Sequence, residues 1–377
     1  MSRAYLAISS IFFVNGVFLA SWVSRIPTVA QHLDLNNAQV GLALLGVAVG
    51  SLSAFPLVGN FISRFGSARV TLVCGLACCL ALVLPAWVPS LLTLFLALIL
   101  FGASIGSMDV AMNAQGIEIE RLEKRTIMNS LHGFFSLGGF AGAALGGLIV
   151  SWGTGLATHF LAVALISAAL LFFMHRLLLP DTSSKEKEKA PVFMLPPRAL
   201  WGLGAIAFCS SIGEGSMADW SALYLNKSLG TTVSVAATGY AVFSLAMLAG
   251  RFSGDHLVAR FGTANVVRTG GAIAALGLAL GLLFHTLSTG LIGFGMVGLG
   301  LSVVVPSVFS AAGKHPTIPS GTAIAAAATM GYSGFLAGPP VLGWIAELSS
   351  LRLALVVVVI LCAMIVLLSP AVKRVTA

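Results

Sequence analysis

The chain has 377 residues, of which 58% are hydrophobic and only 8% are charged. Soluble proteins carry about 25% charged residues, so this composition excludes an ordinary soluble protein and indicates a chain that crosses a membrane many times. The net charge of +8 is explained by basic residues that flank membrane spans, and nucleic-acid binding is not expected.

Twelve apolar runs are each long enough to cross a bilayer, which takes about 20 helical residues. We predict an all-α membrane protein with twelve transmembrane helices, the first of which is retained and not cleaved as a signal peptide. The predicted helices cover residues 4–29, 38–62, 69–88, 90–116, 127–150, 155–178, 198–225, 233–258, 265–287, 289–312, 320–347 and 350–370.

The basic residues predict the orientation of the chain. With the N-terminus in the cytoplasm, only Arg25, Lys227 and Arg352 of the 20 Lys and Arg residues fall on the outside. Such an asymmetry is typical of the positive-inside rule. We therefore expect a protein of the plasma membrane, the inner membrane in a bacterium, with both termini in the cytoplasm.

One charged segment interrupts the apolar rhythm between the sixth and seventh runs. It contains alternating Lys and Glu residues together with prolines, a composition typical of a flexible linker. The sequence therefore predicts a six-helix bundle over 1–178, a cytoplasmic linker over 179–197 and a second six-helix bundle over 198–377.

The two halves repeat short motifs at nearly equal spacing, which indicates a duplication with equivalent helices in parallel orientation. Ala20-Ser-Trp22 recurs as Ala218-Asp-Trp220, and Gly146 recurs as Gly343. Arg64-Phe-Gly66 recurs as Arg260-Phe-Gly262.

Two further motifs carry a family resemblance. Gly59, Arg64, Gly66 and Arg69 lie between the second and third predicted helices, and Arg251, Asp255, Arg260 and Gly262 lie between the eighth and ninth. In this pattern, and in its six-plus-six layout, the whole chain resembles the major facilitator superfamily. Ser63 stands where the family motif usually has an acid.

Asp109-Val-Ala-Met-Asn113, the run that begins at His132 and the run that begins at Glu214 are similar to the MosC/YbjJ-like branch of that superfamily. The resemblance implies two bundles that rock about a central solute site, which opens alternately to each side of the membrane. We expect a monomer.

Asp109 is a carboxyl group inside an apolar span, and an ionisable residue at such depth is costly and commonly functional. It shares one helix face with Gly102, Gly106, Asn113 and Gly116. We interpret Asp109 as a proton acceptor beside an amide that binds solute. The alternative is a structural acid neutralised by a basic neighbour.

The fifth predicted helix places His132 and Ser136 on one face. His132 enters at a depth similar to that of Asp109, so the two could relay protons near neutral pH. The alternative is a histidine satisfied by a backbone carbonyl. The glycines that follow predict close packing of another helix.

The seventh predicted helix carries Glu214 and Asp219, which lie about 140° apart around the helix axis and should face different neighbours. We favour Glu214 as a cavity or coupling acid. On the first helix, Asn15, Trp22 and Arg25 share a face. A charge pair between Arg25 and Asp219 could close an outer gate, and the alternative is an interfacial arginine that reaches to water.

These features predict a proton-coupled symporter that moves a small polar organic solute, sugar- or polyol-like, by alternating access. One alternative is efflux of drugs or metabolites by proton antiport. Another is a membrane receptor or scaffold that transports nothing. The predicted partners are the solute, protons and the lipid bilayer.

Overall fold

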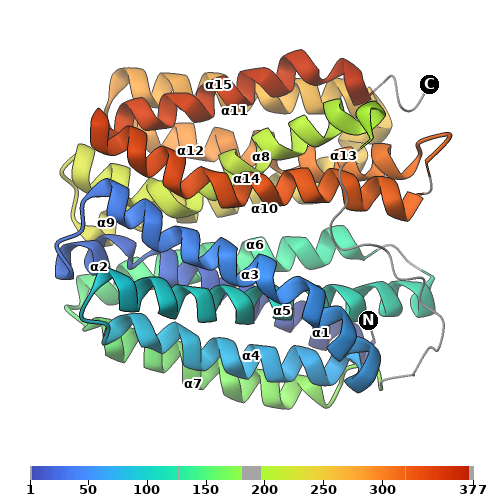
Figure 1. Cartoon of the computed structure of the whole chain (residues 1–377), viewed down its shortest axis with the longest axis horizontal. Helices are drawn as coiled ribbons and strands as arrows, with labels where there is room; N and C mark the ends of the chain where they lie inside the picture. Colours follow the sequence, from blue (N-terminus) through green and yellow to red (C-terminus); the bar gives the residue numbers. More distant parts are fainter. Residues whose placement is uncertain (1, 125–126, 181–196, 319, 373–377) are drawn as a thin grey trace. The chain divides into compact units, whose positions relative to one another are not determined.

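The computed structural model describes residues 2–124, 127–180, 197–318 and 320–372, and within these all regular structure is helical (Figure 1). The linker predicted over 179–197 lies almost wholly outside the described residues. The chain divides into two compact units, one of Met1–Lys187 with Thr231–Ala241 and the other of Glu188–Gly230 with Val242–Ala377.

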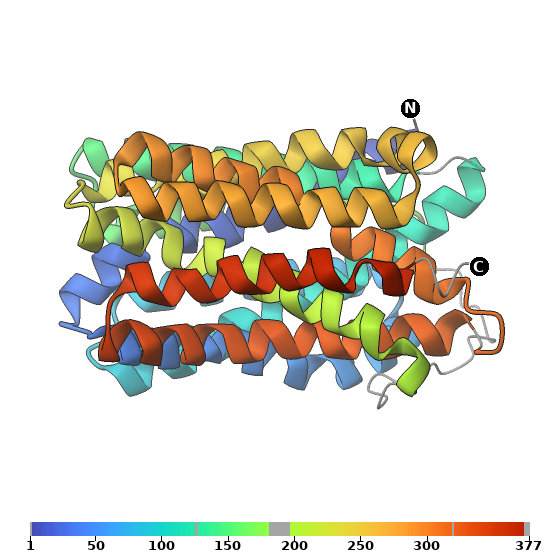
Figure 2. The same cartoon turned by 90° about the horizontal axis from the view of Figure 1, so that it is seen from above.

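The first unit is a bundle of long helices that run along one common direction (Figures 1 and 2). Its elements are α1 (Arg3–Val23), α2 (Ile26–His32), α3 (Asn37–Phe65), α4 (Ser67–Val83), η1 (Leu84–Ala86), α5 (Leu91–Glu123), α6 (Met128–Ser151), α7 (Leu156–His175) and the short α9 (Val233–Ala236).

The second unit is built in the same way. Its elements are η2 (Arg198–Leu200), α8 (Trp201–Leu223), η3 (Tyr224–Ser228), α10 (Thr238–Phe261), α11 (Thr263–Phe284), α12 (Leu287–Leu301), α13 (Val304–Gly313), α14 (Ser320–Leu348) and α15 (Leu351–Leu368). The first residues of α10 belong to the first unit.

Joined pieces such as α1 with α2 and α12 with α13 count as one span each, so the predicted twelve transmembrane helices are confirmed. Ten of these spans are long and apolar enough to cross a membrane by length and composition alone. The other two are α8, which contains Glu214 and Asp219, and α14, which contains Pro339 and Pro340.

Prolines explain why two of the spans are broken. Proline removes a backbone N–H and its ring clashes with the carbonyl four residues earlier. Accordingly α1 ends at Val23, four residues before Pro27, and α12 ends at Leu301, five residues before Pro306. The predicted first span over 4–29 is thus one span made of two helical pieces, and Pro306 divides the span of α12 and α13 in the same way.

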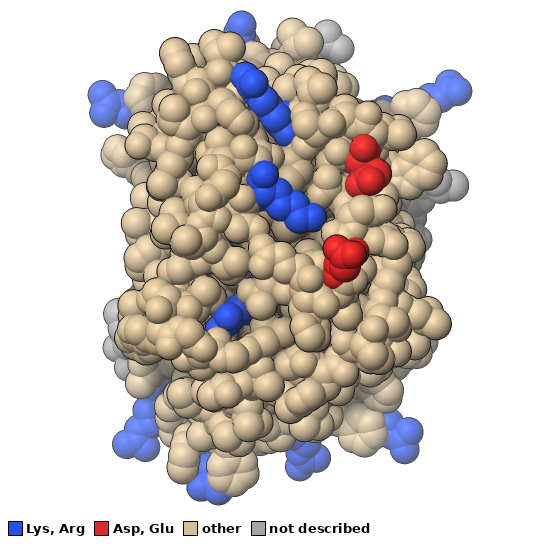
Figure 3. Space-filling model, turned by 90° about the vertical axis from the view of Figure 1, so that its left-hand side faces the viewer, with Lys and Arg blue, Asp and Glu red and all other residues tan. Residues whose placement is uncertain are grey.

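Large apolar side chains cover the sides of the helices. Leu80, Leu348 and Leu367 are between 74% and 78% exposed. Exposed apolar surface of this extent is typical of a membrane-embedded protein, in which lipid tails contact these side chains. The end face that carries α2 and α9 shows few charged side chains (Figure 3).

The duplicated Arg-Phe-Gly motif has the same local structure in both units. Gly66 follows α3 with φ 85° and ψ 154°, and Gly262 follows α10 with φ 78° and ψ 150°. In each motif the arginine guanidinium lies over the ring of the next phenylalanine, at 5.2 Å and 5.3 Å. Only glycine adopts this backbone region readily, so each glycine allows a sharp turn from one span into the next.

Replacing Gly66 or Gly262 by Ala should therefore destabilise the protein by about 1–3 kcal/mol, because a Cβ strains this backbone. Gly59 is a matched control, since it lies in α3 and no atom lies within 4 Å of a Cβ built there. Gly59→Ala should be neutral or stabilising, by about 0.5–1 kcal/mol. Thermal unfolding of purified protein tests this, and equal Tm values for all three variants would contradict it.

Candidate functional site

Glycines of α5 bring α3 close to the helix that carries Asp109. A Cβ at Gly102 would lie 2.0 Å from the Val47 carbonyl oxygen, and one at Gly106 would lie 2.8 Å from the Ser51 side chain. The Ser51 hydroxyl donates a hydrogen bond to the Gly102 carbonyl over 2.8 Å. This part of the predicted polar face is therefore a helix-packing surface, and Asp109 and Asn113 lie beyond it.

Asp109 and Asn113 contact each other one helical turn apart. The Asn113 amide donates to the Asp109 carboxylate over 3.2 Å and to the Asp109 backbone carbonyl over 2.8 Å. Both side chains are half-buried. The Asn113 amide is thus one hydrogen-bond donor to the Asp109 carboxylate, and it supplies no positive charge.

His132 and Ser136 lie on α6, which packs along α1. The His132 ring stands edge-on to Phe12 with ring centroids 5.4 Å apart. The buried Ser136 hydroxyl donates to the His132 carbonyl over 3.2 Å. The predicted proton relay between His132 and Asp109 remains a prediction.

The glycines of α6 pack against α1 as predicted. A Cβ at Gly138 would lie 2.0 Å from the Phe13 carbonyl oxygen, and a Cβ at Gly16 would lie 2.1 Å from the Phe135 carbonyl oxygen. Farther along α6, a Cβ at Gly146 would lie 2.3 Å from the Ser24 hydroxyl. The two backbones are in direct contact, which only glycine permits.

Asn15 and Trp22 on α1 face the interior of the first unit. Asn15 is 2% exposed and its amide lies 3.5 Å from the Ile105 carbonyl oxygen as a long hydrogen bond. Trp22 is 3% exposed, and its indole N–H has no hydrogen-bond partner among the described residues.

In the second unit, Glu214 of α8 forms an ion pair with Arg251 of α10. The two groups are 3.4 Å apart, and their side chains are 26% and 14% exposed. Arg251 was predicted in a loop motif but lies within α10, because that helix continues to Phe261. Asp255 also lies in α10, and its side chain is outside the described residues.

The two predicted gate residues belong to different units. Asp219 is half-buried on α8 and has no hydrogen bond or ion pair with the described part of its own unit. Arg25 is 3% exposed and donates to His159 Nδ1 over 2.9 Å and to the Thr154 carbonyl over 3.0 Å. The charge pair remains a prediction. His159 was not among the predicted site residues, and its place near the start of an apolar span is the sequence signal that marks it.

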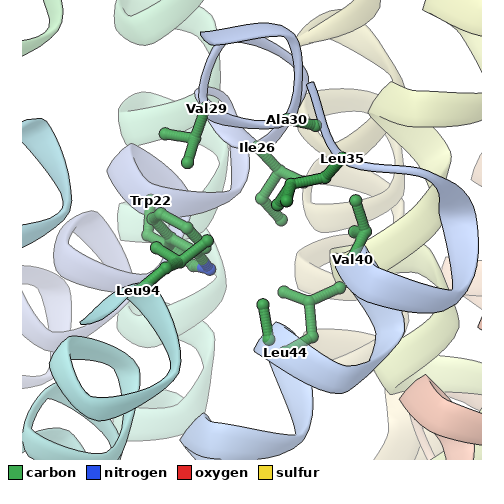
Figure 4. Close-up of a pocket in the computed structure, with 9 residues that line it drawn as sticks. Trp22, Ile26, Val29, Ala30, Leu35, Val40, Leu44 and Leu94 are labelled. Atoms are coloured by element: carbon green, nitrogen blue, oxygen red, sulfur yellow. The ribbon is translucent and has the colours of Figure 1, made fainter. Parts of the chain in front are cut away.

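In the described part of the first unit, neither of two cavities formed by α1 and its neighbours is lined by Asp109 or Asn113. One has a volume of about 10 Å³ and entirely apolar walls that include Trp22, Ile26 and Leu94 (Figure 4). At most it holds one water molecule. The other has a volume of about 200 Å³ and lies where Ser9 and Phe13 of α1 face α6 and α7.

The described residues contain no group of three or more His, Cys, Asp or Glu side chains that could hold a metal ion. All five cysteines are free thiols, in Cys74, Cys78, Cys79, Cys209 and Cys362. The polar groups that meet in the described spans include carboxylates with amide or guanidinium partners and a guanidinium with an imidazole partner.

Sequence comparison places the chain among transporters. The sequence model of the Major Facilitator Superfamily matches residues 6–339 and, in a second match, residues 203–376. An uncharacterised MFS-type transporter of Yersinia pestis is 37% identical over 343 residues, which cover 91% of this chain and 89% of that protein. The membrane protein MosC of Rhizobium meliloti is 36% identical over 359 residues, 94% of this chain and 86% of MosC.

Solved transporters share the fold. The nucleoside transporter NupG superposes with a TM-score of 0.71 at 16% identity, covering 100% of this chain and 99% of NupG. A bacterial homologue of the human lysosomal transporter Spinster, in an inward-facing and occupied conformation, has a TM-score of 0.73 at 16% identity, covering 98% and 96%. Because the family model spans most of the chain and the relatives align over nearly all of it, the chain belongs to the major facilitator superfamily of transporters.

Proposed function

We propose that the protein is a proton-coupled secondary transporter, a symporter that moves a small polar organic solute, sugar- or polyol-like, by alternating access. The observation that supports coupling is the Asp109 carboxylate, which lies in an apolar span and accepts a hydrogen bond from Asn113. An ionisable group at such depth is costly to keep and commonly functional, and proton binding by Asp109 would couple solute movement to the proton gradient.

Buried hydrogen-bonding groups support a polar solute. Equivalent helices of the two halves, α1 and α8, carry buried groups that have no partner among the described residues. They are the hydroxyls of Ser9, Ser21, Ser210 and Ser221 and the indole N–H groups of Trp22 and Trp220. An unsatisfied buried polar group costs about 1–3 kcal/mol. A hydroxylated solute that reached these groups would recover that free energy.

The orientation follows from the basic residues. With both termini in the cytoplasm, the Arg-Phe-Gly turns face the cytoplasm, and Arg25 lies toward the outside of the plasma membrane. We further propose that a pair between Arg25 and Asp219 closes the outer gate of a monomeric transporter. Reversing the charge of Arg25 or Asp219 alone should reduce transport, and exchanging the two charges should restore it. If the exchange restores no transport, the pair does not form the gate.

Transport by purified protein in liposomes tests the proposal. A thermal-shift screen of sugars, polyols, nucleosides and amphipathic drugs first identifies a solute that stabilises the protein. A pH gradient, acidic outside, should then drive uptake of that solute, and a protonophore should abolish the uptake. If the same pH gradient instead drives export of the solute from the liposomes, the antiport alternative is supported. A stabilising solute that shows no flux in either direction would favour a receptor or scaffold.

A further inference from the structure

A buried polar cluster occupies the break between α1 and α2. Arg25 is the residue that precedes α2, and its guanidinium turns inward to His159 in the first turn of α7. Both side chains are almost fully buried, at 3% and 2% exposure. Gly146 of α6 closes the cluster, because a Cβ there would lie 3.5 Å from His159 Cε1.

The direction of the hydrogen bond defines the charge of the histidine. Arginine has only N–H donors, so the Arg25 Nε–H must donate and His159 Nδ1 must accept. The Nδ1 atom therefore carries a lone pair, and His159 is the neutral tautomer with its proton on Nε2. The second bond of Arg25, to the Thr154 carbonyl, also has a neutral acceptor. Within the described part of the first unit, this buried cation is thus held by uncharged groups.

Arg25 is the ionisable group that faces His159 from the elements packed on α7. These elements are α1, α4 and η1, and Gly146 of α6 also lies against His159. The ionisable side chain of α6, His132, lies near the opposite end of that helix. The other ionisable side chains of α1, Arg3 and Tyr5, lie at its opposite end, and η1 has none. α4 carries Arg69 at its far end and cysteines near its middle. His32 and Asp34, in and just after α2, are exposed.

We propose that His159 is a proton-binding site that holds Arg25 when neutral and releases it when protonated. A proton from the aqueous phase adds to Nδ1 and removes the lone pair that accepts the Arg25 N–H. The hydrogen bond is then lost, and two positive charges lie about 2.9 Å apart in a buried site. Arg25 moves away from His159 and becomes available to an anionic partner. The release is independent of transport, and only its use in the cycle rests on the proposed function.

Hydrogen exchange of the purified wild-type protein and of His159→Asn tests the proposal without a solute. The asparagine Oδ1 takes the place of Nδ1 as acceptor but does not titrate. At about pH 8 the two proteins should exchange amides of residues 24–35 and 153–159 equally slowly, and at about pH 5 the wild type should exchange about tenfold faster. Comparison at the same pH cancels the intrinsic pH dependence of exchange.

His159→Leu supplies the second control, since it has no acceptor and should exchange these segments rapidly at both pH values. Equal exchange of the wild type and His159→Asn at about pH 5 would overturn the proposal. Slow exchange of His159→Leu at both pH values would also overturn it, because the bond to Arg25 would then not hold the segment. A protein that transports nothing can still pass this test, so the two proposals fail separately.

Discussion

Replacing Asp109 by Asn should abolish accumulation of solute driven by a pH gradient while leaving solute exchange in place. Asparagine keeps the size of the side chain and an oxygen that accepts from Asn113, so the local contact survives. It cannot bind and release a proton, so solute movement is no longer coupled to the gradient. Gradient-driven uptake should therefore fall to the level of liposomes without protein, and counterflow of labelled solute should continue.

Glu118→Gln is the matched control on the same helix. Glu118 forms an exposed ion pair with Arg121 at the end of α5, with the two charged atoms 2.7 Å apart. Such pairs contribute roughly 0–1 kcal/mol, so this variant should accumulate solute as the wild type does. Full accumulation by Asp109→Asn would show that Asp109 is a structural acid.

Glu214→Gln should also lose accumulation if Glu214 couples, but its ion pair with Arg251 offers a structural explanation for any loss. Removing Glu214 takes a buried acidic partner away from Arg251, which destabilises the bundle. The double variant with Arg251→Gln removes both charges and separates the two explanations. Recovery of both stability and accumulation in the double variant would assign the pair a structural role.

Gly138→Ala should prevent correct folding of the first unit or destabilise it by about 3 kcal/mol or more. The added Cβ would lie 2.0 Å from the Phe13 carbonyl oxygen, and backbone cannot move aside as a flexible side chain can. The reciprocal contact of Gly16 with the Phe135 carbonyl means that α1 and α6 would have to separate along their whole crossing.

The control is Gly155→Ala, at the start of α7, where no atom lies within 4 Å of an added Cβ. Its φ of −61° suits any residue, and exchanging glycine for alanine at this N-cap costs about 1 kcal/mol at most, so this variant should unfold close to the Tm of the wild type. The measurements are Tm and the fraction of protein that elutes as a single species in detergent. A wild-type Tm for Gly138→Ala would show that the two helices can separate at little cost.

Much of the fold follows from local properties of the sequence. The length and apolarity of each run place the twelve spans, because the backbone N–H and C=O groups of a span must form hydrogen bonds within its own helix in the bilayer. Glycine spacing on the fifth helix predicts a close helix contact, and Pro306 predicts a kink. The apolar pattern of the first span does not show the break after Val23, which follows from the steric effect of Pro27 on the preceding turn.

Less of the candidate site follows from the sequence. The pairing of Asp109 with Asn113 lies within one helical turn, and the 3.6-residue period predicts it. The partner of Glu214, by contrast, is on another helix, 37 residues away. Periodicity describes which residues share a face but does not identify the helix that the face meets, so this pair could not be predicted.

The sequence by itself determined that this protein is an all-α membrane protein of twelve spans, because apolarity and helical period are properties of each segment alone. Only the tertiary structure decided that Gly102 and Gly106 pack on α3, that Glu214 pairs with Arg251 and that Arg25 donates to His159. The physical reason is that the rotation of each helix about its axis is set by close packing against its neighbours, and that rotation decides which polar groups meet.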